Sequence, residues 1–339
     1  MNIKIEYLKP GMSYRLFDKP LSENDIMKLK KEKIKRVDIE VVDKRGHLLE
    51  IVVDYLVTML NEAPLDERIT CIDNFISALE INDIYPNFNV YLEEYEPVRN
   101  YIYTSVILSN LIKNYNRIEN STINFHDTIF AYFFKELGRE AKDPRVLEKI
   151  RTFSTRTFYN LHEDFPIIDE ELLNHYNPDF YFIYSYLLLK KREISDSILD
   201  TVLFSFEKEE SSLGPLNTAL VFLEDENLAN RVRVIRASEL YSLFLYVAKD
   251  ETDVPFANVE RNLEKAISQN ILNPFIVNIM TSAMPIYNIG DRVRLSDNTI
   301  GIVDKVNRKD LIHPIVYDLL GNRIDLRREI YIKNIEYED

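Results

Sequence analysis

The sequence predicts a mainly α-helical fold with a small α/β module in front and a short β-rich tail behind. Three patterns in the 339 residues predict it. Residues 1–60 mix short alternating stretches with turn residues, residues 61–285 repeat apolar side chains at helical spacing, and residues 286–339 alternate apolar and polar side chains. We therefore expect three domains with these boundaries.

The first segment predicts two strands around one helix. IKIEYL alternates as a strand does, LKPGM carries the Pro and Gly of a turn, and KRVDIEVVD predicts a second strand. Between them, Ser22 and Asp25 are spaced as a capping box that opens a helix. The following stretch, RGHLLEIVVDYLVTML, is compatible with either a strand or a helix.

The middle segment predicts packed helices. Its clearest apolar stripe has the i, i+4 and i+5 spacing of a buried helix face: Ile102, Val106, Ile107, Leu111 and Ile112. Similar stripes occur in HDTIFAYFFKELGR, FYFIYSYLLLKK, SDSILDTVLFSF, RVIRASELYSLFLYV and NPFIVNIMTSAM. Cys71, in ITCIDNFISAL, has no basic or histidine neighbour in sequence and is expected to be a small core residue.

The third segment predicts short antiparallel strands. IGDRVRLSD, NTIGIVDKV and HPIVYDLLGNRIDL alternate apolar and polar side chains, and Asp-Asn and Gly-Asn pairs mark the turns.

Composition limits the class of partner. A net charge of −14 argues against DNA or RNA, because polyanion binding needs a basic face. The single cysteine excludes an internal disulfide framework and a thiolate zinc cluster. No apolar run approaches the roughly 18 residues of a membrane span, and the N-terminus lacks the apolar core of a signal peptide. We expect a cytoplasmic protein that binds neither nucleic acid nor membrane.

Several segments, in order, carry a resemblance to a bacterial family. FFKELGR overlays the motif LLHDIGK, VLFSFEKEESSLGP overlays VLxHHExxDGxGYP, and RVRVIRASELYSL overlays aRIlxvADxYDAL. The LKPGM turn, the NPFIVNIM stretch and the strands after it also follow the pattern. The chain thus resembles HD-GYP proteins, which hydrolyse cyclic di-GMP at a histidine–aspartate metal site. The resemblance implies a multi-helical HD-type domain over residues 61–285.

The overlay shows a loss of metal ligands at the positions that carry the family's chemistry. The degenerate pocket positions are Lys135 and Glu136 at the His-Asp pair, Arg139 at a lysine, Asn177 at a histidine, Ser205 and Phe206 at paired histidines, Glu207 after them, and Glu239 at an aspartate. A lysine ammonium has no free lone pair, and a phenyl ring has no donor atom. We therefore expect no catalytic residues, no metal and no cofactor. The Lys135 ammonium should instead pair with Glu136, Glu207 or Glu239.

The favoured hypothesis is an inactive HD-GYP-like signalling protein that acts through a protein partner or as a homo-oligomer. One alternative is a non-hydrolysing cyclic di-GMP receptor, in which Arg231, Arg233, Arg236 and Lys249 would hold phosphates, with Arg233 alone matching a family arginine; the other interpretation of these residues is a solvated basic face. A second alternative is a phosphodiesterase with a carboxylate metal site made of Glu136, Glu207, Glu210 and Glu239.

The literal His-Asp pair of the sequence, His126-Asp127, has a structural interpretation. It precedes FFKELGR and should open that helix, with Asn124 as its cap and Asp127 in the first turn.

Overall fold

The computed structural model describes residues 1–14, 17, 19–92, 96–119, 122–137, 181–205, 225–251, 254–307, 310–326 and 330–336. Arg139, Asn177, Phe206, Glu207 and Glu210 lie outside them. Packing of the backbone divides the chain into two compact units, Met1–Asn110 and Leu111–Asp339. This division differs from the three segments 1–60, 61–285 and 286–339, which stay a prediction.

The first unit begins with a two-stranded antiparallel sheet, in which β1 (Asn2–Lys4) pairs with β2 (Arg36–Asp38). A 3-10 turn, η1 (Ile5–Tyr7), follows β1, and α1 (Glu23–Lys31) lies between the strands in sequence. The predicted capping box is confirmed. The Ser22 hydroxyl accepts a hydrogen bond from the Asp25 amide, and the Asp25 carboxylate accepts one from the Ser22 amide.

Helices follow the two strands. The stretch with two possible types forms α2 (Glu50–Glu62), and α3 (Leu65–Ile81) and the 3-10 helix η2 (Phe88–Leu92) come next. Helix α4 (Pro97–Glu119) begins in the first unit and continues into the second, which starts at Leu111. All five residues of the predicted stripe on α4 are buried. Cys71 is a buried core residue on α3, as predicted, and burial raises the pKa of its thiol to about 12.

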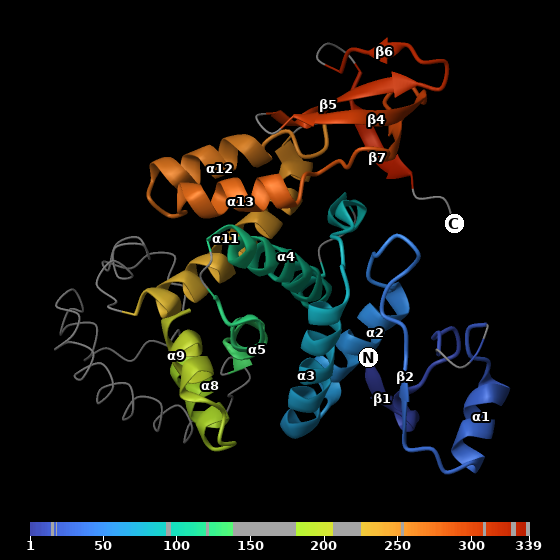
Figure 1. Cartoon of the computed structure of the whole chain (residues 1–339), viewed down its shortest axis with the longest axis vertical. Helices are drawn as coiled ribbons and strands as arrows, with labels where there is room; N and C mark the ends of the chain where they lie inside the picture. The colour runs from blue at the N-terminus through green and yellow to red at the C-terminus, as the bar shows by residue number, and fades with distance from the viewer. Residues whose placement is uncertain are drawn as a thin grey trace. The chain divides into compact units, whose positions relative to one another are not determined.

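The second unit contains a group of packed helices (Figure 1). Their bounds are α5 (Phe125–Phe134), α8 (Tyr181–Lys190), α9 (Asp196–Phe204), α11 (Glu226–Glu251), α12 (Val259–Ser268) and α13 (Pro274–Ala283). Helix α9 packs against α5, α8 and α11, and α11 also packs against α5, α12 and α13. This arrangement brings the C-terminal end of α5, at Lys135, next to the middle of α11, at Glu239.

After α13 the chain forms an antiparallel sheet in the order β6-β5-β4-β3-β7 (Figure 1). Its strands are β3 (Arg292–Leu295), β4 (Ile300–Asn307), β5 (Asp310–Asp318), β6 (Arg323–Ile324) and β7 (Ile332–Glu336). The predicted turns are confirmed: Asn298 (φ 68°) lies between β3 and β4, and Gly321 (φ 85°) between β5 and β6. The chain is therefore mainly α-helical with a β-rich C-terminal part, as predicted. In the described ranges, no helix has the length and apolar character of a membrane span.

Candidate functional site

The Lys135 side chain is buried at the end of an apolar helix. All residues of α5 from Thr128 to Phe134 are buried, and Lys135, the C-cap residue, is only 2% exposed. Its backbone carbonyl accepts a hydrogen bond of 2.9 Å from the Ser185 hydroxyl of α8. A charged group in such surroundings is costly unless a partner compensates its charge.

That partner is Glu239, on α11. The Lys135 Nζ lies 2.6 Å from the Glu239 Oε1, and the Glu239 side chain is 18% exposed. Glu239 is one of the three carboxylates expected as partners from the sequence, and Glu207, another of them, lies outside the described residues. The contact joins two positions that are far apart in the chain and that the sequence overlay had placed at one metal centre.

The other pocket positions are placed only in part. Ser205 is the C-cap residue of α9, is buried, and donates its hydroxyl at 2.5 Å to the Thr201 carbonyl of its own helix. Glu136 is half-buried in the turn after α5. Helix α9 contacts both α5 and α11, so Lys135, Ser205 and Glu239 come from three mutually packed helices. The remaining four positions lie outside the described residues.

The phosphate-binding residues expected from the sequence are spread along α11. Arg233 donates a hydrogen bond of 3.1 Å to the Asn230 side chain of its own helix, and Arg236 is half-buried one turn later. Lys249 lies 13 residues after Arg236 on α11, which is about 20 Å at the rise of an α-helix.

The His126-Asp127 pair opens α5 as predicted. The Asn124 Oδ1 accepts a hydrogen bond of 3.0 Å from the Asp127 amide, and Asp127 lies in the first turn. A hydrogen bond from His126 lowers the pKa of the Asp127 carboxyl below 3.8, and Ser197 and Arg231 lower it further.

Sequence reasoning missed a polar cluster around Arg231. This arginine is 6% exposed and donates a hydrogen bond to the Ser197 hydroxyl at the start of α9. Its Nε is buried and has no hydrogen-bond partner among the described residues. Nearby, burial and then the charge of Asp196 raise the pKa of Asp200. Residues two apart on a helix point in nearly opposite directions, so the alternation of Arg231 and Arg233 was the available clue that they have different roles.

The described parts of the chain were expected to hold no metal site, and their potential ligands are not clustered. No three His, Cys, Asp or Glu side chains there are grouped so that they could hold a metal ion. Glu239, the carboxylate that the overlay places at the metal position, already neutralises Lys135.

Comparison of this chain with protein-family models, curated proteins and solved structures finds no match.

Proposed function

We propose that this chain is a catalytically inactive relative of the HD-GYP proteins, with an HD-type helical domain, and that it acts in signalling by binding other proteins. The observation that carries the proposal is the Lys135–Glu239 ion pair of 2.6 Å. The overlay assigned these residues to neighbouring ligand positions from sequence patterns alone. Their direct contact across two helices supports that assignment.

The Lys135–Glu239 ion pair also supports the proposed loss of metal binding and of catalytic activity. An HD-type phosphodiesterase needs neutral imidazole ligands together with carboxylate ligands, and the carboxylates neutralise the charge of its cations. Here the buried Lys135 ammonium supplies positive charge next to Glu239, the carboxylate that the overlay places at a ligand position, and a metal cation there would be repelled. Ser205 in place of a histidine offers a hydroxyl that is already bonded to its own helix.

A role in protein binding is supported by composition. The chain has 21 tyrosines and 18 phenylalanines, and aromatic side chains are enriched in protein interfaces. Its net charge of −14 disfavours nucleic acid as the partner. The proposal includes a cytoplasmic location.

The receptor alternative has less support, because Arg233 bonds within its own helix and the Lys249 backbone lies about 24 Å farther along it. The carboxylate metal site is less supported as well, since Glu239 is paired with Lys135.

Elemental analysis and a turnover assay on the full chain test the proposal. We expect no stoichiometric iron, manganese or zinc after purification, and no hydrolysis of cyclic di-GMP or of its linear product with any of these metals added. Stoichiometric metal, or hydrolysis that Glu239→Ala abolishes, would overturn it. Calorimetric titration with cyclic di-GMP should give no heat; saturable binding lost in Arg233→Ala would favour the receptor.

A further inference from the structure

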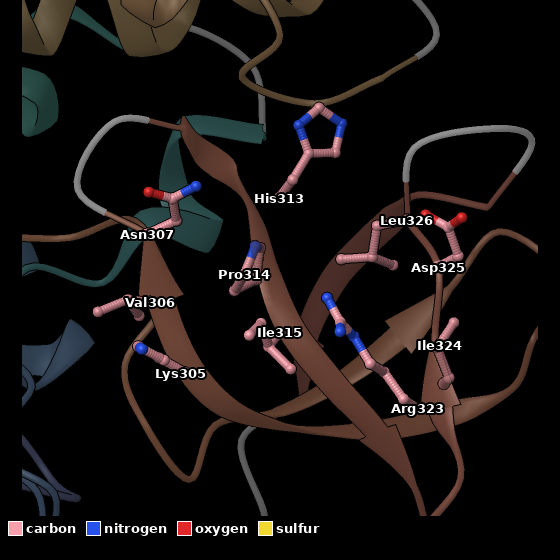
Figure 2. A pocket seen from close by; sticks show the side chains of 10 residues that line it. All are labelled: Lys305, Val306, Asn307, His313, Pro314, Ile315, Arg323, Ile324, Asp325 and Leu326. Atoms are coloured by element: carbon pink, nitrogen blue, oxygen red, sulfur yellow. The ribbon is translucent and has the colours of Figure 1, made fainter.

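The C-terminal sheet carries a groove that the proposed function does not use. It has a volume of about 870 Å³ and is lined by β4, β5, β6 and the residues just after β6. In Figure 2, Arg323, Ile315 and Leu326 point toward the space between β5 and the segment from Arg323 to Leu326. Lys305 on β4 and His313 on β5 also line it.

The groove exists because β6 is much shorter than its neighbour. Strand β5 has nine residues, and β6 pairs only with Val316 and Tyr317. The first part of β5 therefore lacks a strand on that side in the described structure. Two features disfavour the addition of a further strand there: Pro314 has no amide hydrogen, and the Leu311 amide already donates to the Glu260 carboxylate of α12. Recognition in the groove must then rest on side chains.

The groove has a positive lining in an acidic chain. Lys305 and Arg323 are exposed, and neither forms an ion pair within the part of the chain that the structure describes. Asp325 is the acidic member of the lining. The His313 Nδ1 lies 2.6 Å from the Asp310 Oδ1, which orients the imidazole. The lining therefore carries two side chains that are always cationic, Lys305 and Arg323, against the carboxylate of Asp325, whereas the whole chain has a net charge of −14.

Apolar side chains separate these cations. Ile315 is half-buried and Leu326 is buried, so both present only part of their surface to the groove. A compact phosphate site would instead offer backbone amides at a helix N-terminus or a nest, and a single-strand nucleic-acid site would offer aromatic faces. The groove has side-chain cations and aliphatic surface, and its volume suits several side chains.

We propose that this groove binds an extended acidic peptide segment of a protein partner. Carboxylates of the segment pair with Lys305 and Arg323, and its aliphatic side chains contact Ile315 and Leu326. The proposal rests on the proposed function, because it gives the binding surface and the class of partner for a protein that acts by association.

Fluorescence anisotropy with the full chain tests it. The probe is a labelled twelve-residue peptide of alternating Glu and Leu, and the comparison peptides alternate Glu and Ser, or Lys and Leu. Lys305→Glu/Arg323→Glu should weaken binding of the Glu-Leu peptide by at least about tenfold, or 1.4 kcal/mol. The matched control, Lys191→Glu/Lys333→Glu, changes two exposed lysines outside the groove and should leave affinity within about twofold. Lys305→Gln/Arg323→Gln removes both charges but keeps part of the aliphatic stems, so it should weaken binding less than the charge reversal does. This variant tests the proposal even if Lys305→Glu/Arg323→Glu fails to fold.

Three results would overturn the proposal. If the Glu-Ser peptide bound as tightly as the Glu-Leu peptide, the aliphatic side chains of the peptide would contribute nothing to binding. If the control variant lost as much affinity as Lys305→Glu/Arg323→Glu, the peptide would be responding to the net charge of the chain and not to the groove. Full displacement of the peptide by inorganic polyphosphate at equal charge would assign the groove to phosphate ligands. Since none of these readouts involves hydrolysis, a chain that cleaves cyclic di-GMP and still binds the peptide would refute the proposed inactivity and leave the groove in place.

Discussion

At the scale of single residues, Lys135 is the least expected feature of the molecule. Removing an ammonium from water costs several kcal/mol, and attraction to one carboxylate repays this only with good geometry. The Glu239 contact supplies that geometry, and the position of Lys135 at the C-terminal end of α5 adds a favourable interaction with the helix dipole. Such a pair adds little net stability relative to apolar side chains, but it becomes costly when one member is removed.

This asymmetry gives the first prediction. Glu239→Gln should lower the free energy of unfolding by about 3 kcal/mol, because it removes the carboxylate that pairs with the buried Lys135 ammonium. Lys135→Met/Glu239→Leu should stay within about 1 kcal/mol of the natural chain, since both charges are gone. Calorimetric melting measures both, and Glu264→Gln, an exposed change on α12, is the control. Equal stability of Glu239→Gln and the control would contradict the importance of the pair.

The second prediction concerns the pH dependence at Asp127. Because the pKa of this carboxyl is lowered in the folded state, its ionised form contributes stability above the unfolded value near 3.8. That stability is lost as the pH falls through the folded pKa. Asp127→Asn should therefore be less stable than the natural chain at about pH 5, and the difference should shrink as the pH falls below 3.8.

Asp304→Asn, an exposed change on β4, controls for the loss of one carboxylate. A stability difference between Asp127→Asn and the natural chain that does not vary with pH would refute the assignment. Asp200, whose pKa is raised, acts in the opposite direction and is unchanged in both variants.

At the scale of elements, helix starts and turns were predictable because their determinants are local. The capping box at Ser22 and the cap at Asn124 are encoded within four residues. The type of the stretch that became α2 was not, because Val52, Val53 and Leu56 are buried and no clear polar face marks its period. Its helical form is set by packing with the rest of the first unit.

The β5–β6 turn gives a prediction at this scale. Gly321 has a φ of 85°, and a Cβ added there would meet no atom within 4 Å. The cost of Gly321→Ala is therefore backbone strain alone, about 1 kcal/mol. Gly321→Asn should cost less, because Asn tolerates this conformation. Leu320→Ser, at a side chain that is 88% exposed, should change stability little. Thermal melting ranks the three, and an Ala variant as stable as the natural chain would contradict the strain argument.

At the scale of the whole molecule, the sequence predicted the types of secondary structure better than the tertiary contacts between residues that are distant in the chain. The periodicity of apolar residues was sufficient to predict a helical part followed by a β-rich part. The cost of an unpaired ammonium led to the expectation that Lys135 pairs with a carboxylate. The Arg231–Ser197 contact and the groove at Lys305 and Arg323 were missed. Both depend on which helices and strands become neighbours, and no local pattern reports that.

The last prediction asks whether the lost chemistry can be restored. Lys135→His/Glu136→Asp recreates the family's His-Asp pair in sequence, yet we expect neither stoichiometric metal nor hydrolysis of cyclic di-GMP. Asn177, Ser205 and Phe206 would still supply no imidazole, and loss of outer-shell partners alone typically costs a metal site 10–100-fold in affinity. Elemental analysis and a turnover assay measure the outcome, with Lys135→Met/Glu136→Gln as a control that removes the same two charged groups and adds no ligand. Hydrolysis by the first variant and not by the second would show that the remaining positions still form a functional metal centre.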